Sequence, residues 1–211
     1  MAAQRVYFHT RGREVSAAWP SATSRDHSAG FDPAARPAAL DMPKAPAVYL
    51  AHSYGAIIAA LTHRVHPATA LVLVEPALYD IARGHHAVER HIAAVQSARS
   101  AAARGGLWPY WVRIRPLMFG GDAHPSTWAD ERAVAEAFYR RTLPWGHGIT
   151  GDALAGTPML VVSGGWNGEY EEIAARLEGI GARHVILDGY QHRPMDHPDF
   201  AALVDDFCIR F

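Results

Sequence analysis

The chain has 211 residues, of which 49% are hydrophobic and 19% are charged, and its formal net charge is −1. This length suits one domain, or one domain with an insertion, and the near-neutral charge gives no electrostatic reason to expect nucleic acid or a membrane as a partner. The one cysteine, Cys208, excludes an internal disulfide framework. No apolar run approaches the roughly 18 residues of a membrane span. The first ten residues do not resemble a secretory signal, so we expect a cytoplasmic protein.

In the first third of the chain, a region with little hydrophobic patterning is followed by a clear strand and helix pattern. Residues 6–9 form a short apolar stretch that predicts a strand. Residues 11–46 are rich in Pro, Ser, Ala and charge, which predicts mostly loop with a short helix over 33–40. The apolar run 48–51 then predicts a buried strand, and residues 54–64 predict a helix.

The rest of the chain continues this alternation of strands and helices, with one long interruption. Further strands are predicted at 70–74, 159–162 and 184–187. Further helices are predicted at 87–104, 126–142 (capped by Ser126), 169–177 and 198–207. This order predicts an α/β fold, a mostly parallel sheet covered by helices. We expect its core in residues 1–78 and 151–211, and a helical cap inserted at 79–150.

The sequence Ala51-His52-Ser53-Tyr54-Gly55 connects the strand 48–51 to the helix that follows it. A serine on a sharp turn between a strand and a helix is a nucleophile elbow, which exposes its hydroxyl above the sheet. Crowding at such a turn requires small residues two positions before and after the serine, here Ala51 and Gly55. Glycine is usual at both positions, so Ala51 is a mild departure. Ser53 is therefore the candidate nucleophile.

From about residue 48 onward, the chain resembles the α/β-hydrolase superfamily. The segments that carry the resemblance are 51–55, 71–76, 158–165 and 189–200, in this order. The resemblance implies a hydrolase that uses a serine, a histidine and a carboxylate and needs no cofactor. We expect no metal either, because the 13 histidines are scattered without a ligand spacing. Phosphate-binding and dinucleotide-binding glycine motifs are absent from the sequence.

The resemblance implies that the catalytic histidine follows the last strand, and His192 is the candidate there. A serine hydroxyl is a weak nucleophile and needs such a base within hydrogen-bond reach. His197 lies in a His-Pro-Asp-Phe sequence that is typical of a helix start, so we expect a structural role for it. His52 is adjacent to Ser53 in a sharp turn and points away from it, which makes it a packing or pocket residue.

The acid that orients the histidine is less well defined by the sequence. The resemblance implies an acid shortly after strand 159–162, but the chain has an amide, Asn167, at that place. Glu75, directly after strand 70–74, is the favoured candidate. Glu169 or Glu171 is the alternative, and a site without a proper acid is the third interpretation.

An oxyanion hole needs two backbone N–H donors, and elbow geometry makes Tyr54 one of them. Only 52 residues precede Ser53, so compared with the family the N-terminal region is expected to be shortened. Residues 6–12 match either a short oxyanion strand and loop, with Thr10 where glycine is usual, or a later strand that ends at Arg11-Gly12. The uncovered sheet edge of the second interpretation predicts self-association into a homo-oligomer.

Aromatic residues mark the predicted substrate pocket. Its expected members are His52, Trp145, His147 and Trp166. We expect a serine hydrolase that acts on a carboxylic ester or a related small hydrophobic acyl substrate through an acyl-enzyme. The alternatives are a non-catalytic relative that acts as a binding or partner protein, and a cofactor-free lyase or perhydrolase that uses the same Ser/His site.

Overall fold

The computed structural model describes residues 4–9, 12–15 and 47–211, and among the residues before 47 it describes one side chain, that of Tyr7. The helix expected at 33–40 and the residues Thr10 and Arg11 lie outside this part. The described chain forms two compact units. The core unit extends to Arg83 and resumes at Leu143, and the helical unit is Gly84–Thr142. The helical unit lies within the segment 79–150 that the sequence predicts to be an insert.

The core unit is built on a six-stranded sheet with the order β2-β1-β3-β4-β5-β6. The strands are β1 (Gln4–His9), β2 (Gly12–Val15), β3 (Ala47–His52), β4 (Ala70–Val74), β5 (Met159–Ser163) and β6 (Arg183–Ile186). Neighbouring strands from β1 to β6 are parallel, while β2 pairs antiparallel with β1. The predicted mostly parallel sheet is confirmed. Strand β2 is missed by the sequence analysis, which expected loop there.

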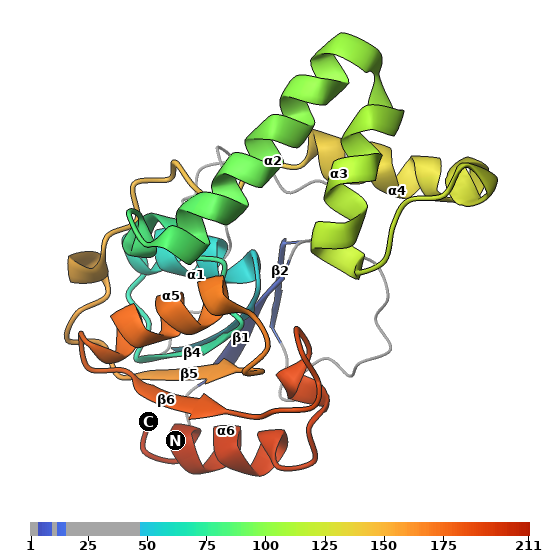
Figure 1. The fold of residues 1–211 in the computed structure, drawn as a ribbon. Helices are drawn as coiled ribbons and strands as arrows, with labels where there is room; N and C mark the ends of the chain where they lie inside the picture. The colour runs from blue at the N-terminus through green and yellow to red at the C-terminus, as the bar shows by residue number, and fades with distance from the viewer. Residues whose placement is uncertain (1–3, 10–11, 16–46) are drawn as a thin grey trace. The chain divides into compact units, whose positions relative to one another are not determined.

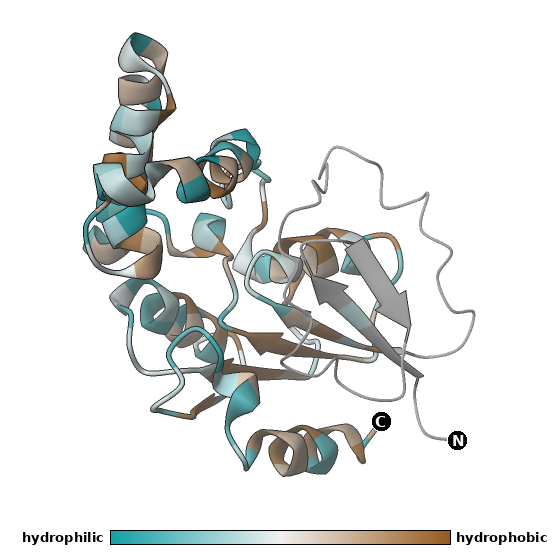
Figure 2. Cartoon of the chain, turned by 90° about the vertical axis from the view of Figure 1, so that its right-hand side faces the viewer, coloured by the Kyte–Doolittle hydropathy of each residue, from teal (hydrophilic) through white to brown (hydrophobic). Residues whose placement is uncertain are grey.

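Helices cover both faces of this sheet. They are α1 (Gly55–His63), α5 (Gly168–Glu178) and α6 (Phe200–Cys208). In Figure 1, α1 and α5 lie on one side of the strands and α6 lies on the other. Every residue of β4 and β5 is buried, because both faces of these strands are covered. The central strands are accordingly hydrophobic along their length (Figure 2).

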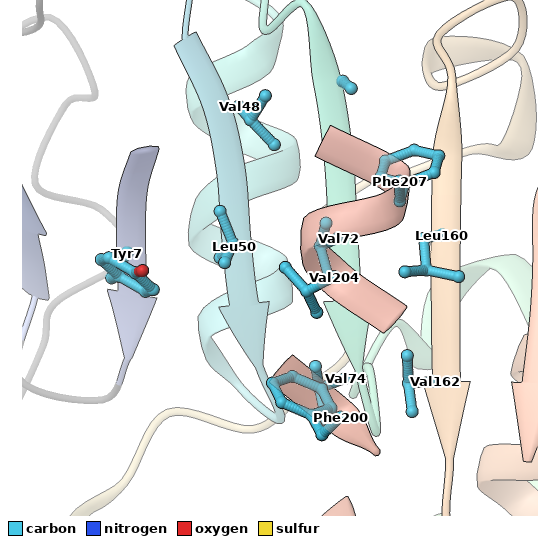
Figure 3. Packing of buried hydrophobic residues seen from close by; sticks show 11 residues of the cluster. Tyr7, Val48, Leu50, Val72, Val74, Leu160, Val162, Phe200, Val204 and Phe207 are labelled. Carbon is cyan, nitrogen blue, oxygen red and sulfur yellow. The ribbon is translucent and has the colours of Figure 1, made fainter. Parts of the chain in front are cut away.

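The α6 side of the sheet holds a well-defined apolar cluster (Figure 3). Phe200, Val204 and Phe207 of α6 pack against alternate residues of the central strands. The strand members of the cluster are Tyr7, Val48, Leu50, Ala70, Val72, Val74, Leu160 and Val162. This period-two pattern follows from the alternation of side chains along a strand. The cluster holds the strands together below the edge that carries the candidate site.

The helical unit contains α2 (His86–Gly105), α3 (Leu107–Phe119) and α4 (Trp128–Arg140). Helix α3 is missed by the sequence analysis, which predicts helices at 87–104 and 126–142 and no helix between them. Within the unit, Trp111 Nε1 and Arg115 Nε of α3 donate to the Glu131 carboxylate of α4. The predicted Ser126 cap is wrong, because a 3₁₀ turn, η3 (Pro125–Thr127), precedes α4.

The described chain also contains further short 3₁₀ turns. These 3₁₀ turns are η2 (Tyr79–Ala82), η4 (Gly151–Ala153) and η5 (Pro194–Asp196). No helix in the described ranges is both long and apolar enough to cross a bilayer.

Candidate active site

The parallel strands bring the candidate residues to one edge of the sheet. Ser53 directly follows β3, Glu75 directly follows β4, and His192 lies in the loop after β6. The backbone hydrogen bonds of the sheet continue into these positions, since Ser53 N–H donates to Val74 O over 2.9 Å and Glu75 N–H donates to Val162 O over 2.8 Å. The nucleophile and acid candidates are therefore fixed to the rigid part of the fold.

Ser53 occupies the turn that its motif predicts. Its φ is +53°, and helix α1 begins two residues later at Gly55. The Ser53 carbonyl accepts N–H groups from Ala56 over 3.0 Å and from Ala77 over 3.1 Å, which ties the turn to the chain after Glu75. Ala51, where glycine is usual, is 0% exposed within β3.

Backbone strain is concentrated at this site. The non-glycine residues with positive φ in the described part of the chain are Ser53, Glu75 and Gln191, at +53°, +46° and +50°. The first two directly follow strands, and Gln191 directly precedes His192. A residue in this conformation costs on the order of 1–3 kcal/mol and persists only where the surrounding structure holds it.

Glu75 is a fully buried carboxylate, 0% exposed, that receives hydrogen bonds on both oxygens. Gly164 N–H donates to Oε1 over 2.7 Å, and Trp166 Nε1–H donates to Oε2 over 2.9 Å. His192 Nδ1 lies 3.2 Å from the same Oε2. A buried carboxylate is tolerated only with such partners, so these three contacts account for its position.

The contact with Glu75 fixes the orientation of the His192 ring. A carboxylate only accepts hydrogen bonds, so Nδ1 of His192 donates to Glu75, and in the neutral ring this leaves Nε2 as the acceptor nitrogen. The ring also contacts the rings of His52, Tyr170 and Trp166, at centroid distances of 4.8, 5.1 and 6.2 Å. His52 Nε2–H donates to the His192 carbonyl over 2.9 Å, which anchors the loop from the elbow side.

Gly164 allows a close approach between two loops of the site. A Cβ atom at this position would lie 2.0 Å from the carbonyl oxygen of Gln191. The loop after β5, which donates to Glu75, therefore packs directly on the backbone that precedes His192. This contact helps to fix the distance between Glu75 and His192.

The other acid candidates have different partners. Glu171 accepts from Ser163 Oγ over 3.0 Å and from Gly165 N–H over 3.1 Å. Glu169 lies in the first turn of α5, where its N–H donates to the Asn167 side chain over 2.9 Å. The amide at Asn167 thus caps α5, and Glu75 is the carboxylate that contacts His192.

The predicted pocket residues Trp145 and His147 lie in the segment that re-enters the core unit. Asp80 holds this segment by accepting the N–H groups of Gly146 over 2.7 Å and of His147 over 2.8 Å. The His147 ring then meets the Tyr54 ring edge-on at 6.2 Å. The Trp145 ring contacts the Tyr79 ring at a centroid distance of 5.9 Å.

Tyr170 is the site residue that the sequence analysis missed. Its hydroxyl is hydrogen-bonded to the Ser53 side chain and to the Tyr79 hydroxyl. Burial raises the pKa of Tyr170 well above its usual range, and the nearby Glu75 carboxylate raises it further. Burial likewise raises the pKa of Tyr79. Both phenols therefore stay protonated at neutral pH.

No family model and no curated protein matches the sequence. The structure does resemble solved ones. A hydrolase from Oleispira antarctica superposes with a TM-score of 0.50 at 14% identity, over 77% of this chain and 65% of that chain. MenH from S. aureus gives a TM-score of 0.49 at 14% identity, over 79% of this chain and 69% of that chain. Carboxylesterase CesB from Bacillus subtilis gives a TM-score of 0.44 at 17% identity, over 77% of this chain and 60% of that chain.

The chain has the α/β-hydrolase fold. The superposition on the Oleispira antarctica protein and the strand order confirm the fold that the sequence predicts. At these identities the comparison shows the fold alone. The chain spans between 60% and 69% of the lengths of these three proteins.

In the sheet, β1 lies beside β3, the strand that leads to Ser53. It pairs in parallel with β3, with Phe8 opposite Ala51, so its carboxyl end reaches the level of the elbow. The pairing places the carboxyl end of β1, from which the first interpretation of residues 6–12 expects an oxyanion donor, beside β3. The backbone N–H of Tyr54, the other predicted donor, lies at the N-terminus of α1, where N–H groups point out of the helix and favour negative charge.

Proposed function

We propose that the protein is a serine hydrolase that acts on a carboxylic ester or a related small acyl compound. Ser53 is the nucleophile, His192 the base, Glu75 the acid that orients His192, and Tyr54 N–H a donor to the oxyanion. The observation that carries the proposal is the buried Glu75 carboxylate 3.2 Å from His192 Nδ1. The same pair favours a catalytic protein over a non-catalytic relative. Burying a carboxylate beside a histidine lowers the stability of the fold, and packing alone does not require such a pair.

The proposed reaction has two steps. In the first, Ser53 Oγ attacks the carbonyl carbon while its proton passes to His192 Nε2, and negative charge develops on the carbonyl oxygen near Tyr54 N–H. The imidazolium, stabilised by Glu75, then gives the proton to the departing alcohol. In the second step a water molecule, activated by the same histidine, hydrolyses the acyl-enzyme and restores Ser53.

The residues around the base favour an uncharged substrate with apolar character. Apart from the buried Glu75 carboxylate, the side chains in contact with the His192 ring are aromatic rings and an imidazole, and Trp166 is 41% exposed beside it. Exposed aromatic surface next to a nucleophile binds apolar groups well and charged groups poorly. A short acyl ester fits this environment.

The test is covalent labelling of the folded protein with an alkyl fluorophosphonate, read by peptide mass spectrometry. We expect labelling at Ser53 that is abolished in Ser53→Ala and reduced by orders of magnitude in His192→Ala. Circular dichroism of each protein establishes that it is folded. A folded wild-type protein that stays unlabelled contradicts the proposal and favours the non-catalytic interpretation.

A further inference from the structure

A second group of polar side chains lies beside the candidate site, at the carboxyl end of β5. Ser163 is the last residue of β5, and its Oγ lies 3.0 Å from Glu171 Oε2 of α5 and 2.7 Å from His184 Nε2 of β6. These are the residue types of a catalytic triad, but Ser163 is 0% exposed, so no substrate reaches its hydroxyl. The group is therefore not a second catalytic site.

The chemistry of the three side chains fixes the direction of their hydrogen bonds. A carboxylate only accepts, so the Ser163 hydroxyl donates its one proton to Glu171 Oε2. Ser163 Oγ can then only accept from the histidine, so Nε2 of His184 carries a hydrogen. Donation runs from His184 through Ser163 to Glu171, and it holds the Glu171 carboxylate in one orientation.

The other oxygen of Glu171 anchors the loop that precedes α5. Gly165 N–H donates to Glu171 Oε1 over 3.1 Å. Gly165 has a φ of +68°, and a Cβ atom at this position would lie 2.9 Å from Ile186 Cγ2 of β6. The turn at Gly165 is therefore closely packed against β6 and bound to Glu171 at the same time.

Gly165 lies between the two residues of the loop that bind the acid. Gly164 N–H and the Trp166 indole N–H donate to the two oxygens of Glu75, over 2.7 and 2.9 Å. A shift of Gly165 also moves these neighbours, because they are joined to it by peptide bonds. Glu75 is fully buried, so water does not replace a donor that it loses. The alignment of Glu75 with His192 thus depends on the anchor at Gly165.

We propose that Glu171 is a positioning residue for the acid. It holds the loop 164–166 against Glu75, and Ser163 and His184 orient it for this purpose. Glu171 acts on the reaction only through the loop and Glu75, because each of its own oxygens already binds a donor away from His192. The inference rests on the proposed hydrolase function of the same site.

The experiment measures the second-order rate of Ser53 labelling by an alkyl fluorophosphonate in the full-length protein. Glu171→Gln keeps the size of the side chain but places an NH₂ group against one of the two donors. A shift of about 1 Å at reacting groups costs about a hundredfold, and a loosened loop moves the acid by less, so we expect labelling to slow about tenfold. Ser163→Ala leaves the bond to Gly165 in place and should slow labelling about threefold.

Glu172→Gln is the matched control. Glu172 is the next residue of α5, and it forms an ion pair with Arg176 of the same helix. The variant makes the same change of charge, and we expect its labelling rate to stay within about twofold of wild type. Equal slowing by Glu171→Gln and Glu172→Gln would assign the effect to the charge of α5 and would overturn the inference.

A double variant with Glu75→Gln separates positioning from a merely structural role. If Glu171 acts through Glu75, Glu171→Gln has little further effect once the acid has been replaced. A general loss of structure would instead slow labelling by the same factor in both backgrounds. Circular dichroism of each variant establishes that it is folded. Should Glu171→Gln not fold, Ser163→Ala is compared with wild type and in the Glu75→Gln background in the same way.

Two results overturn the inference. One is a folded Glu171→Gln protein that labels as fast as the wild type, and the other is an effect that recurs in full in the Glu75→Gln background. A wild-type protein that does not label at all overturns the proposed function instead, so the two failures are distinguishable.

Discussion

Glu75 is the residue on which the proposed chemistry depends most directly. Replacement by Gln keeps the shape but puts an NH₂ group in contact with donors, because Gly164 N–H, Trp166 Nε1–H and His192 Nδ1–H all point at the carboxylate. We expect Glu75→Gln to favour the wrong histidine tautomer and to slow fluorophosphonate labelling by about 10³- to 10⁴-fold. The labelling rate at Ser53 measures this loss.

Asn167→Asp is the control for Glu75→Gln. It introduces a carboxylate at the position where the fold more often has its acid, and Asp caps a helix as well as Asn does. We expect a labelling rate within a few-fold of wild type. A double variant that adds Asn167→Asp to Glu75→Gln tests whether the acid has to follow β4. If this double variant labelled as fast as the wild type, a carboxylate at position 167 could replace Glu75.

Gly164 sets the spacing between the two halves of the acid–base pair. In Gly164→Ala the new Cβ would lie 2.0 Å from Gln191 O, so the loop that carries His192 has to move. We expect labelling to slow at least a hundredfold, since a shift of about 1 Å at reacting groups has a cost of that order. Gly151→Ala is the control, because its Cβ would be in ordinary contact, 3.6 Å from Ile180 Cδ1. Equal rates for both variants would contradict the argument.

At the residue scale, the sequence reveals the parts of the site that have a local signal. Ser53 is recognisable from its own turn, and His192 from its place after the last strand. The choice among Glu75, Glu169 and Glu171 stayed open because it depends on which loops pack together in three dimensions. No sequence motif marks Tyr170. A tyrosine in a helix lies at the site only if the folded chain orients that helix toward it, and the sequence does not show this orientation.

At the element scale, long apolar runs were predictable and polar or aromatic segments were not. Strand β4 has the predicted bounds because its five residues are all apolar and buried. Strand β2, with the sequence GREV, forms by pairing with β1 and carries no apolar run. Helix α3 contains Pro116, which ordinarily argues against a helix interior, and Trp111 and Arg115 of the same helix bind Glu131 of α4.

The Asp80 carboxylate binds two backbone N–H groups of the loop 143–149. Asp80 accepts N–H groups from Gly146 and His147 on its two oxygens. Asp80→Asn removes the charge and one acceptor, so we expect hydrogen exchange at these two amides to accelerate roughly ten- to a hundredfold. Exchange measured by mass spectrometry on a peptide that covers this loop tests it.

Asp152→Asn is the matched control for this loop. Asp152 is exposed in the nearby turn η4. Its replacement should leave the exchange of the loop unchanged. Acceleration of equal size in both variants would mean that net charge, and not the Asp80 contacts, controls the loop.

At the scale of the whole molecule, buried phenols occur in both compact units and link stability to alkaline pH. Burial raises the pKa of Tyr110 in the helical unit to about 12, and it raises the pKa values of Tyr79 and Tyr170 in the core unit. The unfolded chain releases these protons near pH 10. The folded chain keeps them, so above this pH the unfolded state binds fewer protons and folding stability decreases.

The expected loss is up to about 1.4 kcal/mol per pH unit for each phenol, beginning near pH 10. For Tyr110 the loss ends as the pH passes about 12. Urea unfolding at several pH values between about 9 and 11 measures the slope. In Tyr110→Phe one titrating group is gone, so its stability should decrease less steeply with pH than that of the wild type. Tyr190→Phe removes a 42% exposed phenol and should retain the wild-type slope. If Tyr110→Phe also kept the wild-type slope, the alkaline loss would not arise from this buried phenol.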